Sequence, residues 1–230
     1  MAGAIITGAS RGLGLALAHG LAAQGWRLVI DGRDADALAE AAAGIPHDVT
    51  ALAGDVTDPA HRAALVEAAH RIGGADLLVN NAGILGPSPQ PALADYPLDA
   101  LREVYEVNVV APLALTQLAL PGLRVHKGAI VNVTSDAAVE GYTGWGGYGS
   151  AKAAVEQASR VLAAEEPALR VWWVDPGDLR TRMHQQAFPG EDISDRPEPA
   201  TVVPAFLRLL ADRPPSGRIK LADLFTPADL

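Results

Sequence analysis

Tyr148 and Lys152 are the residues whose types and spacing best suit proton-transfer chemistry, and Ser135 precedes Tyr148 by thirteen residues. Positions i and i+4 share one face of a helix, so the phenol and the ammonium can point into one site. A phenol with a pKa near ~10 is a poor acid or base at neutral pH, but a nearby fixed cation favours the phenolate and lowers that pKa. The pair therefore predicts a tuned general acid or base. A chance Tyr-x-x-x-Lys on an amphipathic helix is the competing interpretation.

A glycine-rich turn near the N-terminus predicts a phosphate-binding site and makes chance a poor explanation of that pair. The turn reads Thr7-Gly8-Ala9-Ser10-Arg11-Gly12-Leu13-Gly14 and follows a short apolar stretch. Its glycines permit a tight turn and a close approach of the backbone to a pyrophosphate. The helix that follows directs free N–H groups and its positive end toward that anion. No Gly-Lys-Ser/Thr follows, so the turn is not a P-loop.

Strands and helices alternate along the chain. Apolar runs predict strands at 4–7, 27–31, 49–54, 76–80, 129–134, 170–174 and 217–221. Helical periodicity predicts helices at 13–22, 35–43, 59–72, 97–123 and 147–165, the fourth of them bent at Pro112. This order predicts an α/β fold, a doubly wound parallel β-sheet with helices on both faces, in a single domain over residues 1–230. The Pro- and Gly-rich stretch 178–199 follows the sixth strand and is expected to be a substrate lid.

Composition argues against several classes of protein. Of the 230 residues, 49% are hydrophobic, which is enough for a sizeable core. A net charge of -9 argues against nucleic-acid binding, and the absence of cysteine excludes disulfides and thiolate chemistry. The histidines are scattered without metal-ligand spacing, so no metal site is expected. Neither a leader nor an apolar run of about 18 residues is evident, so we expect a cytoplasmic location and no membrane partner.

Several motifs together resemble the short-chain dehydrogenase/reductase family, in its single-domain, Tyr-x-x-x-Lys branch. Besides the glycine turn and Tyr148-Gly149-Ser150-Ala151-Lys152, they are Asp55-Val56, Asn80-Asn81-Ala82-Gly83, Asn108, Ser135 and Pro176-Gly177-Asp178-Leu179-Arg180-Thr181. The resemblance covers nearly the whole chain and implies a Rossmann-type fold that binds a nicotinamide cofactor. One departure is Trp172-Trp173, which stands where smaller residues are usual and is expected to face opposite sides of the sheet.

The resemblance also implies how the cofactor is held. Asp55 and Val56 would hold the adenine, and the segment after strand six would fix the nicotinamide carboxamide. The residues expected to bind the cofactor are Gly8, Ser10, Arg11, Gly12, Leu13, Gly14, Arg33, Asp55, Val56, Asn80, Asn81, Ala82, Gly83, Tyr148, Lys152, Pro176, Gly177, Leu179 and Thr181.

The end of the second strand bears on the choice between NADP and NAD. An acidic side chain there binds the ribose 2′-hydroxyl of NAD, whereas arginine suits the 2′-phosphate of NADP. By resemblance the acid would stand at Gly32 and the arginine at Arg33, and Arg11 could add a second cation. These residues favour NADP (NADPH). Asp31, one residue before Gly32, keeps NAD as the alternative.

The resemblance assigns the catalytic roles to four residues. Tyr148 would be the acid in reduction and the base in oxidation, and Lys152 would tune it and bind the nicotinamide ribose. Ser135 would donate a hydrogen bond to the substrate oxygen. Asn108 would position a water that relays protons to Lys152; the competing interpretation is a helix-interior amide that holds a kink near Pro112.

The expected function is an NADP-dependent carbonyl reductase that interconverts a ketone or aldehyde with an alcohol by hydride transfer. A cofactor-neutral isomerase, epimerase or dehydratase on the same fold is the alternative, and a non-catalytic nucleotide sensor is a third interpretation. The long helices 97–123 and 147–165 are expected to join neighbouring subunits in a homo-oligomer, either a dimer or a tetramer. His184 lies in the lid, where a surface position is expected and contact with substrate is the alternative. Trp145 either lines the substrate entrance or packs locally.

Overall fold

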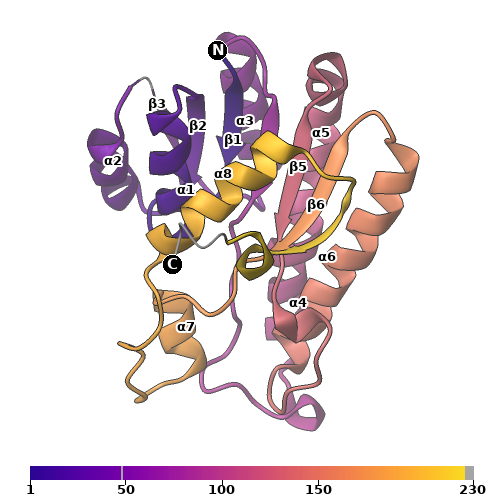
Figure 1. Cartoon of the computed structure of the whole chain (residues 1–230). Helices are drawn as coiled ribbons and strands as arrows, with labels where there is room; N and C mark the ends of the chain where they lie inside the picture. The colour runs from indigo at the N-terminus through magenta and orange to yellow at the C-terminus, as the bar shows by residue number, and fades with distance from the viewer. Residues whose placement is uncertain (48, 226–230) are drawn as a thin grey trace.

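A parallel β-sheet forms the centre of the molecule in the computed structural model, which describes residues 1–47 and 49–225 (Figure 1). Within those residues the sheet has seven strands in the order β3-β2-β1-β4-β5-β6-β7, and every adjacent pair is parallel. The strands are β1 Gly3–Ile6, β2 Arg27–Gly32, β3 Val49–Ala53, β4 Leu77–Asn80, β5 Ala129–Val133, β6 Arg170–Asp175 and β7 Gly217–Lys220. The strand order reverses between β1 and β4, which is where ligands of such sheets bind. The predicted doubly wound sheet is confirmed, including its last edge strand.

Helices cover both faces of the sheet (Figure 1). They are α1 Gly12–Ala23, α2 Ala35–Gly44, α3 Pro59–Arg71, α4 Leu98–Tyr105, α5 Ala111–His126, α6 Gly146–Glu165, α7 Arg182–Ala187 and α8 Val203–Asp212. Successive strand residues point to opposite faces. Accordingly Ile6 packs in one cluster with Phe206 of α8, and Ile5 packs in another with Leu65 of α3 and Leu115 of α5. Burying each such side chain contributes roughly 1.5–3 kcal/mol.

The predicted long helix is interrupted before Pro112. A π-helical segment, Glu106–Val110, separates α4 from α5, and Pro112 lies in the first turn of α5. The backbone stays helical from α4 through the wide turn into α5, so Pro112 follows helical residues and its missing N–H leaves a carbonyl of the wide turn without that donor. The predicted irregularity near Pro112 is therefore present as a π-helical turn directly before it. Asn108 lies in this turn.

The α4–α5 stretch, Leu98–His126, has the length and composition of a membrane-spanning helix. Its 29 residues reach a mean hydropathy of 1.2 over the most apolar window, of which 39% is buried. Leu115 and Leu123 on this stretch are fully buried against the sheet and α3. Packing on the core accounts for the buried part of this apolar stretch.

The two tryptophans of β6 face opposite sides of the sheet, as predicted. Trp172 is fully buried in the cluster beneath α1 and α8. Trp173 lies beneath α6, where the guanidinium of Arg160 stands 5.5 Å from its ring centroid. Trp173 is also the register partner of Arg218 in β7, so both residues point toward α6. The strand accommodates two large rings because each ring packs between the sheet and a different layer of helices.

Candidate active site

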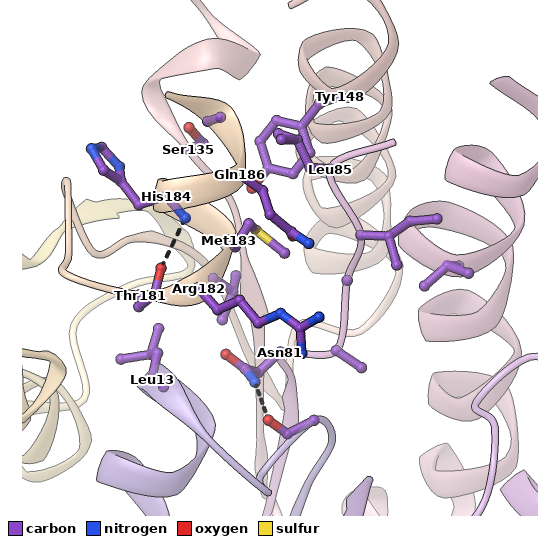
Figure 2. A pocket seen from close by; sticks show the side chains of 18 of the residues that line it. Leu13, Asn81, Leu85, Ser135, Tyr148, Thr181, Arg182, Met183, His184 and Gln186 are labelled. Atoms are coloured by element: carbon purple, nitrogen blue, oxygen red, sulfur yellow. Dashed lines mark hydrogen bonds between the residues drawn. The ribbon is translucent and has the colours of Figure 1, made fainter. Parts of the chain in front are cut away.

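A cavity of about 820 Å³ opens along the carboxyl ends of the strands and collects most of the predicted site residues (Figure 2). Eighteen of them line it: Gly8, Ser10, Arg11, Gly12, Leu13, Arg33, Asp55, Val56, Asn81, Ala82, Gly83, Ser135, Tyr148, Lys152, Pro176, Gly177, Leu179 and Thr181. Gly14, Asn80 and Asn108 are not among the lining residues. The glycine turn and the Tyr148 pair, which lie far apart in the sequence, thus face the same space.

The glycine turn is packed too tightly to accept side chains. Gly8 has a φ of 66°, and a Cβ there would stand 2.9 Å from the Cα of Ala82. A Cβ at Gly14 would stand 2.4 Å from the carbonyl oxygen of Gly8. The Nδ2 of Asn81 donates to the carbonyls of Thr7, at 2.8 Å, and Gly8, at 3.1 Å. The bare backbone that results offers the close approach that a pyrophosphate requires, so this cradle fits a dinucleotide.

Asp31 lines the cavity, but both of its carboxylate oxygens already have partners within the protein. One carboxylate oxygen accepts a hydrogen bond from the backbone N–H of Gly8 at 2.6 Å, and the other lies 3.1 Å from Nε2 of His61. The side chain is only 1% exposed. A Cβ at Gly32 would stand 3.0 Å from the Cβ of Ser10, so the family's usual acid position is also crowded. Neither position therefore offers a free carboxylate to a ribose.

Arg11 and Arg33 are two of the cations at this end of the cavity. Both line it and both are exposed to solvent. Partial burial raises the pKa of Asp55, but hydrogen bonds from the backbone and hydroxyl of Thr57 and the charge of Arg33 outweigh it and hold that pKa below its usual range. Asp55 is therefore ionised and fixed at the cavity wall near Arg33.

At the other end of the cavity, α6 presents Tyr148 and Lys152 from its first two turns. The Nζ of Lys152 donates to the backbone carbonyl of Val133 at 2.8 Å and lies 5.4 Å from the centroid of the Tyr148 ring. The hydroxyl of Ser135 donates to Asp136 at 2.8 Å and accepts from the N–H of Ala137 at 3.2 Å. The structure therefore brings Ser135, Tyr148 and Lys152 to one wall of the cavity.

The pKa of Tyr148 moves in the direction opposite to the one predicted. Burial raises it, and the charges of Asp136 and Asp175 raise it further. Burial lowers the pKa of Lys152 to about 8. The spacing of Tyr148 and Lys152 reveals the nearby ammonium but not the desolvation of both groups, and desolvation opposes whichever form is charged. In the protein alone, Tyr148 is therefore a neutral phenol at physiological pH and a proton donor.

Asn80 and Asn108, which do not line the cavity, hold neighbouring elements of its wall in place through hydrogen bonds. Asn80 donates to Thr116 at 3.1 Å and to Asn132 at 2.7 Å, which ties β4 to α5 and β5. The amide of Asn108 accepts from the N–H of Ile84 and donates to its carbonyl, at 2.9 and 2.8 Å. Both polar atoms of that amide are thus used to hold the segment after β4. The relay through Asn108 stays a prediction.

The predicted lid contains helix α7, which forms one wall of the cavity. Thr181 caps this helix by accepting from the N–H of His184 at 3.1 Å, and the side chain of Arg182 extends toward Asn81 (Figure 2). Met183 packs in a cluster with Tyr148. The expectation of a surface His184 was wrong, because its side chain is 10% exposed and lines the cavity. The closing motion of the lid stays a prediction.

Several residues that line the cavity were not predicted from the sequence. They include Leu85, Asp136, Arg182, Met183, Gln186 and Ala187. Helix α7 has six residues, too few for a helical period to stand out. Trp145 does line the cavity, with its ring edge-on to Tyr148 at a centroid distance of 5.9 Å. Within residues 1–47 and 49–225, no group of three His, Cys, Asp or Glu side chains could hold a metal ion.

Comparison with known proteins agrees with this geometry. The family model described as short chain dehydrogenase matches residues 2–192. Serine 3-dehydrogenase from Agrobacterium fabrum is 36% identical over 183 residues, which cover 77% of this chain and 72% of that protein.

Solved structures share the whole fold. The oxidoreductase yciK from E. coli superposes with a TM-score of 0.89 at 29% identity, covering 96% of this chain and 94% of that one. An alcohol dehydrogenase from the archaeon Thermococcus sibiricus, complexed with 5-hydroxy-NADP, gives a TM-score of 0.84 at 26% identity, covering 96% and 95%. The family model, the relative and the shared fold lead to one conclusion: the chain is an oxidoreductase of the short-chain dehydrogenase/reductase family.

Proposed function

We propose that this protein is an NADP-dependent oxidoreductase that interconverts a ketone or aldehyde with an alcohol. The observation that carries the proposal is one cavity with a turn of closely packed glycines and exposed arginines at one end and Ser135, Tyr148 and Lys152 at the other. The first end suits a dinucleotide, and the second suits proton transfer to an oxygen.

In the direction of reduction, the bound nicotinamide supplies a hydride to the carbonyl carbon. The phenol of Tyr148 gives its proton to the carbonyl oxygen, which becomes the alcohol hydroxyl. Its raised pKa keeps this proton in place until negative charge develops on the substrate. The hydroxyl of Ser135, which donates to Asp136 in the protein alone, turns to donate a second hydrogen bond to the same oxygen. The ammonium of Lys152 stabilises the phenolate left behind.

Three observations support NADP over NAD. Both oxygens of Asp31 are already engaged, by Gly8 and His61. Arg11 and Arg33 present exposed guanidinium groups, which suit a 2′-phosphate. A similar alcohol dehydrogenase binds a derivative of NADP.

The wall around Tyr148 favours a carbonyl substrate with an apolar substituent. Leu85, Ala137 and Tyr148 form one apolar cluster, and Trp145 and Met183 pack against it. The stretch 178–199 supplies Met183 from α7, so we propose that this lid selects the substrate and shields it from water.

Net consumption of NADPH is the direct test of the reaction class. The purified protein would be incubated with NADPH and a panel of ketones and aldehydes with apolar substituents, while NADPH absorbance is followed. Stoichiometric loss of NADPH with alcohol formation supports a reductase. Conversion of substrate without loss of NADPH would identify an isomerase or dehydratase, and binding of NADPH without turnover of any compound would identify a sensor.

We also propose that the protein assembles as a homo-oligomer through α4, α5 and α6. These helices and the π-helical segment between α4 and α5 carry exposed apolar side chains: Leu98, Val110, Leu113, Leu118, Val125 and Val161. Such side chains lose unfavourable contact with water when a second copy covers them.

A further inference from the structure

Arg218, on the edge strand β7, contacts three parts of the active-site frame at once. Its Nε donates to Glu156 of α6 at 2.9 Å, and its Nη2 donates to Asp175 at the end of β6 at 2.9 Å. The same Nη2 lies 3.2 Å from the backbone carbonyl of Ser135. This arrangement follows from the register, since Arg218 pairs with Trp173 and points toward α6.

Each contact belongs to an element that carries a site residue. Glu156 lies one turn beyond Lys152 on α6. Asp175 lines the cavity and also accepts from the N–H of Gly177 at 3.0 Å, which fixes the turn that follows β6. Ser135 is itself a site residue. We propose that Arg218 is a positioning residue for the reaction, a guanidinium clamp that holds Ser135, the Asp175–Gly177 turn and helix α6 in their working geometry.

The Arg218 guanidinium neutralises buried carboxylates, so its removal should destabilise this part of the site. Glu156 is 1% exposed, and Asp175 is 7% exposed. Arg160 also reaches Glu156, at 3.3 Å, so the two carboxylates are balanced by two guanidinium groups. Without Arg218, Glu156 keeps Arg160 and the hydroxyl of Thr134, at 3.0 Å. Asp175 keeps the N–H of Gly177 and becomes a buried carboxylate without a cationic partner, beside the cavity.

Arg160 provides a matched control. It pairs with the same carboxylate from the same helix, but its contacts are Glu156, Gln157 and Trp173, and none of these lines the cavity. Loss of Arg160 therefore tests the general stabilisation of Glu156, whereas loss of Arg218 tests the connection to Ser135 and Asp175.

The experiment compares Arg218→Ala with Arg160→Ala in the full chain, and it rests on the proposed function only for its kinetic arm. We expect Arg218→Ala to lower kcat by on the order of 10- to 100-fold, because a displacement of about 1 Å at a reacting group costs that much. Arg160→Ala should stay within about twofold of the wild type. The double variant Arg218→Ala/Asp175→Asn should recover part of the loss, since the neutral amide keeps an acceptor for the Gly177 N–H.

A second arm uses amide hydrogen exchange on the cofactor-free protein, which requires no substrate. Arg218→Ala should speed exchange in residues 133–138 and 175–181, whereas Arg160→Ala should leave both segments protected. If the two variants change kcat equally, or change hydrogen exchange equally, the proposal is overturned. Arg218 would then act only as an ion-pair partner of Glu156. If the wild type reduces no carbonyl compound, the proposed function fails, and the exchange arm still decides the role of Arg218.

Discussion

The two ends of the cavity present different groups. At the end formed by the glycine turn, backbone is closely accessible, and the cations Arg11 and Arg33 are exposed to solvent. At the chemical end, the groups are side chains, and Tyr148 and Lys152 are 8% and 5% exposed, with the pKa of each displaced by burial. Solvent and salt screen an exposed charge, so it contributes little free energy to binding. A buried charge is screened much less and contributes more. Substitutions should therefore have graded effects at the first end and severe effects at the second.

The largest effect is expected for Tyr148→Phe. Loss of the hydroxyl removes the proton donor, and general acid–base transfer commonly contributes about 10²–10⁴-fold, so turnover should fall by that factor. Affinity for NADPH, measured by fluorescence titration, should stay close to normal. If the Phe variant keeps more than about a tenth of the wild-type rate, Tyr148 is a packing residue.

Ser135→Ala should fall within a similar range. The lost hydroxyl would no longer polarise the substrate carbonyl, and removing one such donor costs about 10²–10³-fold in kcat. The KM for the carbonyl compound should change much less than kcat. A variant with raised KM and normal kcat would assign Ser135 to substrate binding alone.

Lys152→Met should damage activity and yet stabilise the fold. The pKa of Lys152 in the folded protein is about 8, below its ordinary value of 10.5, so the unfolded chain holds this proton more tightly. Charged Lys152 thus destabilises the fold fully below pH ~8, and the penalty fades as pH rises toward about 10.

The penalty corresponds to at most roughly 3 kcal/mol, less the hydrogen bond to Val133 that the variant loses. Urea unfolding at pH ~7 should show the Met variant as the more stable protein, and its advantage should shrink at pH ~9.5. If the wild type is the more stable protein at both pH values, the hydrogen bond from Lys152 to Val133 contributes more free energy than desolvation costs.

A smaller effect is expected for Arg33→Ala at the nucleotide end. NADPH should bind at least about tenfold more weakly, which is roughly 1.4 kcal/mol, while NADH should change little. Asp31→Asn is the matched test, because Asp31 supports the Gly8 turn and should affect both cofactors alike. Selective loss of NADH in Asp31→Asn would show that Asp31 binds the ribose and that NAD is the cofactor.

The smallest effect on catalysis is expected from a change on the outer face of α5. Leu118→Glu places a charge on the apolar surface formed with α4 and α6, where Leu118 is 44% exposed. Size-exclusion chromatography with light scattering should show an oligomer for the wild type and a smaller species for the variant. A wild-type monomer at micromolar concentration would refute the oligomer.

The sequence by itself determined the parallel sheet, the glycine turn and eighteen of the residues that line the cavity. Apolar periodicity and short motifs are local properties, and they need no knowledge of which segments meet in space. This is why β7 was predictable as an edge strand, and why Tyr148 and Lys152 could be paired from their spacing together with Ser135 and the glycine turn.

The tertiary structure determined the burial, the hydrogen-bond partners and the pKa values of those residues. Asp31 is 23 residues from Gly8 and 30 from His61, and no spacing rule predicts that they occupy its carboxylate. The pKa of Tyr148 depends on burial and on Asp136 and Asp175, which converge only in the folded chain. Arg218 reaches Ser135 across 83 residues. Desolvation and long-range pairing arise from the packing of distant segments, and that packing exists only in three dimensions.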